Sequence, residues 1–364
     1  MRLLNCRLDE VKKSIGAKGI VFFGQGSWLQ SVDYTELMEL QESFRYVVDN
    51  NPKNEVILGG CTLEVCKPER LLNEKDIVII LSSPVYMYDM YKQLEEMKLD
   101  ESIDCYAFPF MQKVSDHEID SLIDFRGGKK QLIPKVIHSF WFSGDEKPES
   151  YRKCIETWPE ILKGYEIKEW NMDNYDWHKH PFLEKAIELK AWAFATDYAR
   201  LDVLWQLGGI YMDMDVEVIK PFDDLLGNDA ILSFSNNTMV DLAVMGARQN
   251  NELVKKLIEL YNNVEIPNEK VGFSKFFQPS FVRKTLAENG IIMNGCLQKT
   301  DYATIFPHEF FMPLDFVTFD ECRTENTYCV HYDNFGWSYD ADNKRQKKMT
   351  DNRKLWRMVE HEQD

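Results

Sequence analysis

The sequence has no apolar run long enough to span a bilayer, which takes about 20 consecutive apolar residues. Its opening segment, MRLLNCRLDEVKKS, lacks the apolar core of a signal peptide. None of the eight cysteines belongs to a Cys-x-x-Cys pair of the kind that binds zinc. We therefore expect reduced thiols and a cytoplasmic protein, either in the bulk cytoplasm or at the inner face of the membrane.

Positive charge is also scarce, because 43 Lys and Arg residues stand against 60 Asp and Glu residues, a net charge of −17. Such a balance argues against nucleic acid as a partner. Residues 342–357, DNKRQKKMTDNRKLWR, reverse the balance locally with seven Lys or Arg residues. This segment is either a solvated terminal helix or a peripheral contact with an anionic membrane surface.

The most informative segment that is present reads GGIYMDMDVE (208–217), in which one residue separates Asp213 from Asp215. If the apolar strand continues through these residues, both carboxylates point to one face of it. Two neighbouring carboxylates repel each other unless a cation lies between them. Mg²⁺ and Mn²⁺ take oxygen ligands and complete their coordination with substrate phosphates. The segment therefore predicts a metal–diphosphate site.

The residues before this motif predict one buried helix from Pro181 to Leu207, which ends at a Gly-Gly pair. Inside its apolar part lie Asp197 and Arg200, which share a helix face because they are three residues apart. They form either an ordinary buried ion pair or contacts to sugar hydroxyls and phosphate. Because the helix leads directly into the Asp-x-Asp motif, we favour the contact with substrate.

Taken in order, the segments IPKVIHSFWFSG (133–144) and FATDYARLDVLWQLGGIYMDMDVEVIKPFDDLL (194–226) resemble a known enzyme family. This is the sugar-binding glycosyltransferase family with a DXD motif. It includes yeast-type initiating mannosyltransferases, bacterial capsule glycosyltransferases and, more distantly, the large clostridial glucosylating toxins. The resemblance covers about residues 131–340. It implies a GT-A fold, a nucleotide-sugar donor, a divalent metal and retention of anomeric configuration.

The resemblance also implies roles for single residues around the donor. Trp141 would stack on the donor base, although a core position for this ring is equally compatible with its bulk. Asp197 and Arg200 would contact the donor sugar and the diphosphate, and Tyr211 would line the same site. His138 is expected to hold the end of its strand rather than to act as a base.

For the metal, the resemblance implies that Asp215 is a direct ligand and that Asp213 lies near the ribose and the water shell of the cation. The late segment CVHYDNFGWSYD (329–340) offers His331 as a further metal ligand and Trp337 as a ring that closes over the diphosphate. Gly336 stands before this Trp where the family usually has a serine, so the sequence does not predict a hydroxyl contact from that position.

Residues 1–130 predict a smaller, Rossmann-like unit. KGIVFFGQGSW (18–28), RYVVDN (45–50) and DIVIILSS (76–83) predict strands, and the first runs into a glycine turn and a helix. The turn has Gly24 and Gly26 but lacks the third glycine of a dinucleotide fingerprint, while Asp49 stands near the place of a ribose-binding acid. We favour a helper or docking domain over a nucleotide-binding one.

The fold expected from these observations is α/β: a Rossmann-like domain (1–130), a GT-A glycosyltransferase domain (131–340) and a basic C-terminal helix or tail (341–364). The function expected is metal-dependent, retaining transfer of a hexose from a nucleotide sugar, with UDP-hexose as first donor and GDP-mannose as second. Mn²⁺ or Mg²⁺ is the expected cofactor, and the catalytic group is Asp197, Arg200, Asp213 and Asp215.

The expected acceptor is a glycan or a lipid-linked saccharide, as in the synthesis of a bacterial surface polysaccharide such as a capsule. Two other functions are consistent with the same observations. One is a metal-dependent nucleotide-sugar pyrophosphatase or phosphoesterase, which also uses an Asp-x-Asp site. The other is a scaffold without catalytic activity in a polysaccharide-synthesis complex.

Overall fold

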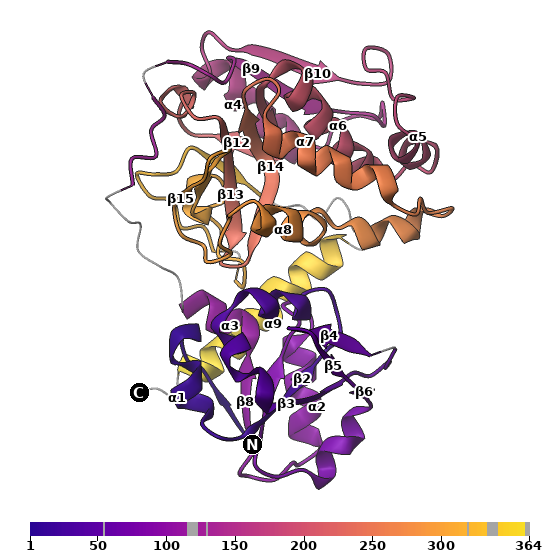
Figure 1. Cartoon of the computed structure of the whole chain (residues 1–364), viewed down its shortest axis with the longest axis vertical. Helices are drawn as coiled ribbons and strands as arrows, with labels where there is room; N and C mark the ends of the chain where they lie inside the picture. The colour runs from indigo at the N-terminus through magenta and orange to yellow at the C-terminus, as the bar shows by residue number, and fades with distance from the viewer. Residues whose placement is uncertain (54, 115–122, 129, 319, 333–340, 361–364) are drawn as a thin grey trace. The chain divides into compact units, whose positions relative to one another are not determined.

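The computed structural model describes residues 1–53, 55–114, 123–128, 130–318, 320–332 and 341–360 (Figure 1). The chain forms two compact units. Unit 1 contains Met1–His117, Asp315–Asp320 and Asp342–Asp364, and unit 2 contains Glu118–Leu314 and Glu321–Ala341. The C-terminal segment that we expected as a separate helix or tail is thus grouped with the N-terminal unit.

Unit 1 is built on a sheet of six parallel strands in the order β1-β8-β7-β2-β3-β6. The chain runs outward from β2 to β3 and β6, and then returns to the other side of β2 for β7 and β8. This is a doubly wound arrangement, as the sequence predicted. The strands, in sheet order, are β1 (Arg2–Leu4), β8 (Asp104–Ala107), β7 (Ile77–Leu81), β2 (Gly19–Phe23), β3 (Phe44–Val48) and β6 (Val65–Cys66).

The remaining elements of unit 1 are short, except for the C-terminal helix. The expected helix after Gly26 is a 3-10 segment, Leu29–Tyr34, instead of the α-helix that presents its N-terminus to a dinucleotide. The α-helices and the hairpin strands are α1 (Val11–Ile15), α2 (Met87–Glu96), α3 (Phe108–Val114), α9 (Ala341–Glu360), β4 (Val56–Leu58) and β5 (Cys61–Leu63). The other 3-10 segments are Leu8–Glu10, Glu36–Ser43 and Pro68–Asn73.

The loops that follow β2 and β7 are covered by other parts of unit 1. Trp28 stacks on Phe316 with 6.4 Å between ring centroids. Asn352 of α9, fully buried, donates its amide to the carbonyls of Pro84 (2.8 Å) and Val317 (3.0 Å). An open α/β sheet binds its ligands at this switch point between outward and returning strands. In unit 1, side chains of the protein itself pack against the loops at this switch point, which supports the structural role that we favour for this unit.

Unit 2 is built on a seven-stranded mixed sheet in the order β10-β9-β11-β14-β13-β16-β15. Strands β10, β9 and β11 are parallel, whereas β14 runs antiparallel to both of its neighbours, β11 and β13. The strands are β10 (Glu166–Trp170), β9 (Val136–Phe140), β11 (Gly209–Met212), β14 (Met239–Ala247), β13 (Ala230–Asn236), β16 (Thr304–Phe306) and β15 (Gln298–Lys299). A two-stranded sheet pairs β12 (Val216–Val218) with β17 (Cys329–His331).

Unit 2 also contains α4 (Glu149–Ile161), α5 (Pro181–Glu188), α6 (Trp192–Leu207), α7 (Glu252–Glu259) and α8 (Gln278–Glu288). Short 3-10 segments cover Asp223–Leu225, Leu260–Asn263, Lys270–Phe276 and His308–Phe310. The parallel sheet of unit 1 and the mixed sheet of unit 2 confirm the predicted α/β class with a smaller doubly wound unit. None of the helices in the described part of the chain is both long and apolar enough to cross a membrane.

The prediction of one continuous helix from Pro181 to Leu207 is wrong. Helix α5 ends at Glu188, and α6 begins at Trp192. Lys190 adopts a left-handed backbone with φ of 54°. The amide of Ala191 bonds to the carbonyl of Ala186 (2.8 Å), and the amide of Lys190 bonds to that of Ile187 (2.9 Å), which is the Schellman pattern of helix ends. A lysine fills the position that glycine usually takes, so no helix-stop signal is visible in the sequence here.

The predicted end of the helix at Gly208 and Gly209 is correct, and both glycines are needed there. Both have positive φ, 66° and 111°. A Cβ on Gly208 would lie 2.9 Å from Pro134 Cδ, and one on Gly209 would lie 2.7 Å from the carbonyl oxygen of Val136. Glycine is therefore required at both positions for β11 to run beside β9 in the sheet.

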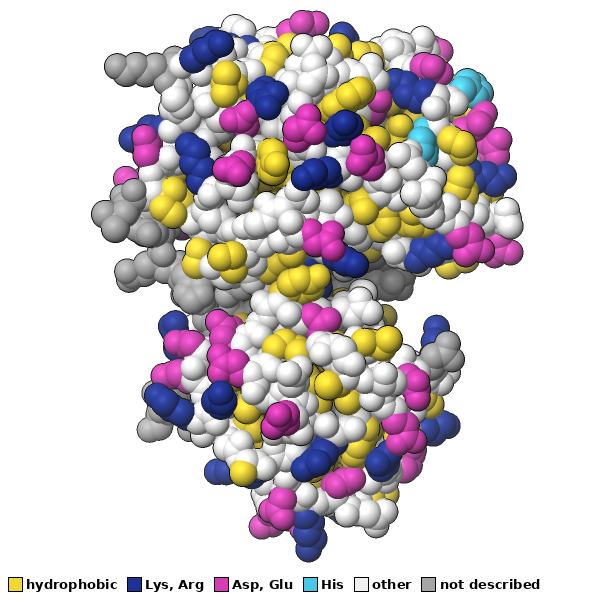
Figure 2. All heavy atoms as spheres, viewed as in Figure 1, with side chains coloured by type: hydrophobic (Ala, Val, Ile, Leu, Met, Phe, Trp, Pro, Cys, Tyr) yellow, Lys and Arg dark blue, Asp and Glu magenta, His cyan; other side chains and the backbone are white. Residues whose placement is uncertain are grey.

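Figure 2 shows one face of the molecule. On this face acidic and basic side chains are mixed over both units, with hydrophobic side chains between them. The described part of the chain therefore shows no large basic area on this face.

Candidate active site

The two aspartates of the Asp-x-Asp motif lie in a turn rather than in a strand. Strand β11 ends at Met212, and β12 begins at Val216, whose amide donates to the carbonyl of Asp213 at 3.2 Å. The prediction that both carboxylates share one strand face is therefore wrong in its geometry. The turn nevertheless brings Asp213 and Asp215 to one place, where both approach the same histidine.

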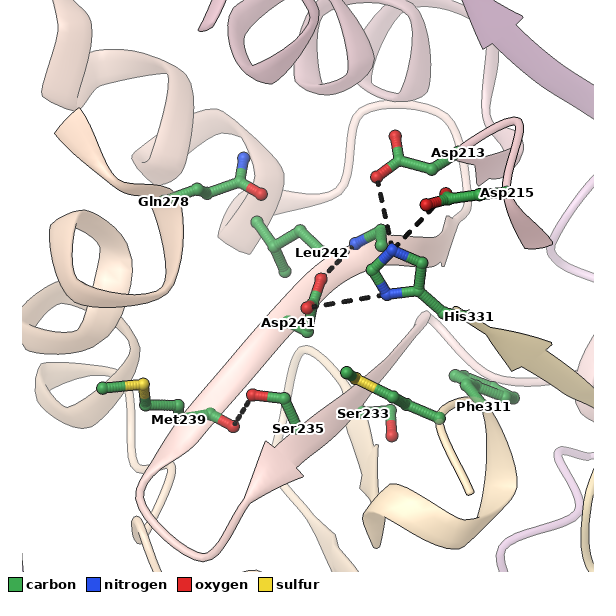
Figure 3. A network of polar contacts seen from close by, with 12 residues as sticks. Asp213, Asp215, Ser233, Ser235, Met239, Asp241, Leu242, Gln278, Phe311 and His331 are labelled. Carbon is green, nitrogen blue, oxygen red and sulfur yellow. Dashed lines mark hydrogen bonds and ion pairs between the residues drawn. The ribbon is translucent and has the colours of Figure 1, made fainter. Parts of the chain in front are cut away.

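That histidine is His331, and strand pairing brings it there. In the antiparallel β12–β17 pair, Val216 stands opposite His331. His331 Nε2 lies 3.5 Å from Asp215 Oδ1 and 4.0 Å from Asp213 Oδ2 (Figure 3). One ligand atom from each of the three residues fits within 4.8 Å of the others. Two carboxylates and an imidazole form a donor set that could hold a divalent cation.

The predicted Asp197–Arg200 pair is present on α6 and reaches the turn. Arg200 Nη2 lies 2.9 Å from Asp197 Oδ1 and 3.4 Å from Asp213 Oδ1. The guanidinium also packs over the ring of Tyr211, 4.5 Å from its centroid. Arg200 thus connects the helix with the Asp-x-Asp turn and supplies a buried positive charge beside it.

Two further contacts fix Arg200 from the other side. Its Nη1 donates to the carbonyl of Leu242 on β14 at 2.9 Å and to the side-chain oxygen of Gln278 on α8 at 3.3 Å. Sequence reasoning did not find Gln278, since a single glutamine at the start of a helix carries no distinctive signal. The guanidinium is therefore held in one orientation before any ligand binds.

Tyr211 lies in the centre of this network, with only 1% of its surface exposed. Its hydroxyl donates to the carboxylate of Asp213. Burial raises the pKa of Tyr211 well above its usual value, against the opposing effect of Arg200. The phenol therefore stays protonated and keeps its role as a donor to the acid.

The site has more acidic than basic side chains. Burial raises the pKa of Asp197 to about 7, while the positive charge of Arg200 lowers it and the carboxylates of Asp213 and Asp241 raise it further. Burial opposes the charge of Arg200, but the surrounding acids raise its pKa above the usual value. One guanidinium and one imidazole face four carboxyl groups, so the site favours an added cation.

Trp141 follows β9 and lies half-buried at the same sheet edge as the motif. Its amide donates to the carbonyl of Trp170 (2.8 Å), and its indole nitrogen donates to the carbonyl of Asp145 (2.7 Å). In the parallel β9–β11 pair, His138 stands opposite Tyr211. The chain therefore leaves both strands at one edge, which agrees with the predicted place of Trp141, whereas stacking on a base stays a prediction.

His138 has the structural surroundings that we expected. It is fully buried, its Nε2 contacts the carbonyl of Gly208 at 2.9 Å, and Trp170 donates its indole N–H to Nδ1 at 3.1 Å. Because Nδ1 accepts the hydrogen bond from Trp170, the proton of the neutral ring is on Nε2. Burial also lowers the pKa of His138, so the ring stays neutral. Its contact with the carbonyl of Gly208 links β9 to the Gly208–Gly209 turn. The predicted donor contact Trp337, with Gly336 before it, lies outside the described residues.

Asp241 is a site residue that the sequence reasoning missed. It lies on β14, and its Oδ2 is 3.8 Å from His331 Nδ1. The strand reads MVDLAVMGA and is apolar apart from this acid. An aspartate inside an otherwise apolar strand is the signal that would have identified it, since buried acids need partners.

Comparison with known families places the motif in the expected group. The family model described as "Glycosyltransferase sugar-binding region containing DXD motif" matches residues 148–232. This segment contains α6 and the Asp-x-Asp turn, but it does not include His331 or Asp241. The match confirms the resemblance that the motifs predicted.

Several curated proteins are similar over part of the chain. "Uncharacterized glycosyltransferase L373" of Acanthamoeba polyphaga mimivirus is 35% identical over 102 residues, which is 26% of this chain and 41% of that protein. "Inositol phosphoceramide mannosyltransferase 1" of Schizosaccharomyces pombe is 28% identical over 38% of this chain and 43% of its own. "Mannosyl phosphorylinositol ceramide synthase SUR1" of Saccharomyces cerevisiae is 32% identical over 33% of this chain and 32% of its own. The match thus spans less than half the length of each of these relatives.

Two solved structures are similar at a lower level. "PaToxG Glycosyltransferase" gives a TM-score of 0.34 at 18% identity, over 43% of this chain and 68% of that one. The "crystal structure of a glycosyltransferase involved in the glycosylation of the major capsid of PBCV-1" gives a TM-score of 0.33 at 13% identity, over 59% of this chain and 98% of that one.

Proposed function

We propose, on the premise that this chain belongs to the DXD-containing glycosyltransferase family, that it transfers a hexose from a nucleotide sugar to a hydroxyl group. The observation that carries the proposal is the convergence of Asp213, Asp215 and His331 within 4.8 Å, beside the fixed guanidinium of Arg200. A site with this arrangement suits a substrate that carries a diphosphate.

The three residues would hold a divalent cation, Mn²⁺ or Mg²⁺. Asp215 and His331 are both buried, and Nε2 of His331 lies 3.5 Å from Oδ1 of Asp215. Bound there, the cation would neutralise the diphosphate and lower the barrier to breaking the glycosidic C–O bond. Its role rests on the donor set and on the negative balance of the site.

Arg200 has the features of a preorganised cation for the leaving group. Its position is set by Asp197, by the Leu242 carbonyl and by Gln278, so it needs no rearrangement when charge develops on the leaving phosphate. Asp197 orients the guanidinium and accepts hydrogen bonds from sugar hydroxyls. Retention of configuration, with the acceptor attacking from the face that the leaving group occupied, follows from the family resemblance alone.

The donor and acceptor are proposed more coarsely. We keep UDP-hexose and GDP-mannose as the donors to test. The relatives named for mannosyl transfer to inositol phosphoceramide favour mannose as the sugar and a lipid-linked acceptor over a soluble glycan. A role in capsule synthesis and a cytoplasmic location stay predictions, as does membrane contact through residues 342–357.

The test is a panel of nucleotide sugars with Mn²⁺, in which released nucleoside diphosphate and glycoside product are both measured. We expect one donor to be consumed with release of nucleoside diphosphate and to be transferred when an acceptor is present. Release of a sugar phosphate instead would indicate the pyrophosphatase. If the chain binds neither Mn²⁺ nor any nucleotide sugar, the proposal is wrong and the scaffold function is favoured.

A further inference from the structure

His331 has acids on both sides of its ring. Nε2 faces Asp213 and Asp215, whereas Nδ1 faces Oδ2 of Asp241 at 3.8 Å (Figure 3). Asp241 is not part of the set whose ligand atoms fit within 4.8 Å of one another. It lies behind the imidazole, seen from the proposed metal position.

Asp241 is itself held by the backbone of β14. Its Oδ1 accepts the amide of Ala243 at 2.6 Å, so Oδ2 remains turned toward the histidine. The carbonyl of the same Ala243 accepts the amide of Asp213 at 2.8 Å. This follows from the β11–β14 register, which pairs Met212 with Val244. One short piece of β14 therefore fixes an acid of the motif and the acid behind the histidine.

A histidine that binds a metal through one nitrogen commonly offers its other N–H to a carboxylate, and this partner sets the tautomer and the ring orientation. When a cation takes Nε2, the proton of the neutral ring is on Nδ1, where the carboxylate of Asp241 attracts the N–H dipole. Without the cation, Asp215 and Asp213 attract a proton to Nε2 in the same way, so the Nδ1–H form is expected only with the cation bound. At 3.8 Å the contact between Asp241 and Nδ1 is electrostatic and longer than a hydrogen bond.

We propose that Asp241 is a positioning residue for His331: it stabilises the Nδ1–H tautomer and holds the ring so that Nε2 is available to the cation. This inference rests on the proposed metal site but assigns a role to a residue outside the ligand set and outside the segment that matches the family. It predicts that Asp241 acts on the metal only through His331.

The first experiment measures Mn²⁺ binding to the full chain without nucleotide, by loss of the free Mn²⁺ signal in electron paramagnetic resonance. Asp241→Asn is expected to weaken Mn²⁺ binding about 10- to 100-fold, the usual effect of losing an outer partner of a metal-bound histidine. The matched control is Asp229→Asn, which removes the same charge just before β13, where Asp229 pairs with Arg248 on the surface. This control is expected to bind Mn²⁺ like the unaltered chain.

A double-mutant cycle separates positioning from other effects of the charge. If Asp241 acts through His331, Asp241→Asn causes no further loss in a chain that already carries His331→Gln. A further loss of similar size in that background would show that Asp241 acts as a ligand or as a distant charge, and would overturn the inference.

The second experiment needs no activity and uses Mg²⁺, which is diamagnetic, in place of Mn²⁺. Nitrogen-15 spectra of histidine-labelled protein report which ring nitrogen of each of the seven histidines carries the proton, and His331→Gln assigns the signal. We expect the Nδ1–H form of His331 in the unaltered chain at saturating Mg²⁺, and in Asp241→Asn this form should need about 10- to 100-fold more Mg²⁺ to appear. An Nε2–H form in the unaltered chain at saturating Mg²⁺ would overturn the inference.

The outcomes distinguish this inference from the proposed function. If the chain binds Mn²⁺ and loses it in Asp215→Asn but not in Asp241→Asn, the inference alone is wrong. If both variants behave as expected while no nucleotide sugar is consumed, the proposed transfer alone is wrong. If the unaltered chain binds no Mn²⁺, the metal site and the inference are both wrong.

Discussion

His331 stands opposite Val216 in the β12–β17 pair, so its ring reaches the carboxylate of Asp215, the residue just before Val216, at 3.5 Å. The register of two short strands thus joins the Asp-x-Asp turn with a residue far along the chain. His331 lies in β17, and the turn that carries the two aspartates is itself held by backbone hydrogen bonds, from the amide of Asp213 to Ala243 and from the amide of Tyr332 to Asp215.

Asp215→Asn is expected to weaken Mn²⁺ binding by at least about 100-fold, more than the loss of an outer partner costs, because it removes a direct carboxylate ligand. Donor turnover should fall with it at all practical Mn²⁺ concentrations. Calorimetry with Mn²⁺ and release of nucleoside diphosphate measure the two effects. Turnover near the level of the unaltered chain would show that the metal assignment is wrong.

Arg200→Ala is expected to destabilise the chain by about 3–5 kcal/mol, since it leaves the buried carboxyl of Asp197 and the partly buried carboxylate of Asp213 without their cation. Urea unfolding monitored by tryptophan fluorescence measures the change. Asp197→Asn combined with Arg200→Gln removes both charges and should cost less than Arg200→Ala alone. An equal or larger cost for the double variant would mean that packing, rather than charge, holds this position.

Asp197 should make the stability of the metal-free chain depend on pH. Its ordinary pKa is 3.8, and burial raises the pKa in the folded chain to about 7. Between these values the folded state binds the proton and the unfolded state does not. The free energy of unfolding therefore decreases as pH rises from about 4 to about 7 and changes no further above that range.

Asp197→Asn removes this contribution, so the stability of the variant relative to the unaltered chain should increase between pH 5 and pH 8. Urea unfolding at the two values measures the difference, and Asp229→Asn serves as a control that should show no such trend. If the stability of Asp197→Asn relative to the unaltered chain decreases as pH rises, Arg200 outweighs burial and keeps the Asp197 carboxyl charged.

The local parts of the site were predictable from the sequence. Asp197 and Arg200 are one helical turn apart, so helix geometry brings them together whatever the tertiary fold. Asp213 and Asp215 are separated by one residue and stay neighbours in the turn that replaces the expected strand. The glycines 208 and 209 mark the end of α6 correctly, because their positions exclude a Cβ. His331 was found through the family resemblance and not through spacing.

The parts that depend on strand register were not predictable. Asp241 reaches His331, and Leu242 reaches Arg200, because β14 runs antiparallel beside β11, which no local pattern indicates. The turn at the motif was missed because GIYMDMDVEV reads as one strand. The break between α5 and α6 was missed because a lysine, rather than glycine or proline, occupies the left-handed position.

That lysine provides a test of the helix break. Lys190→Gly should stabilise the chain by about 0.5–1 kcal/mol, since glycine adopts the positive φ of 54° without the clash that a Cβ brings. Lys190→Ala removes the same charge and side chain but keeps the Cβ, so it should give no gain. Thermal unfolding measures both. A gain of equal size for the two variants would assign the effect to the lysine side chain instead of the backbone.

Asn352 provides a test of the packing inside unit 1. Asn352→Ala leaves the carbonyls of Pro84 and Val317 without their donor in a buried position, which should cost about 1–3 kcal/mol. Lys354→Ala, at an exposed position of the same helix, should change the free energy of unfolding by less than about 0.5 kcal/mol. Thermal unfolding of both variants measures the contrast.

The same measurement tests whether unit 1 binds a nucleotide. Because Trp28, Phe316 and Asn352 pack around the loops after β2 and β7, NAD, NADP and S-adenosylmethionine should leave the unfolding temperature unchanged. A clear rise with one of them in the unaltered chain would show that these side chains give way to a ligand. If Asn352→Ala then strengthened that rise, α9 would be a competitor for the site rather than a permanent part of the core.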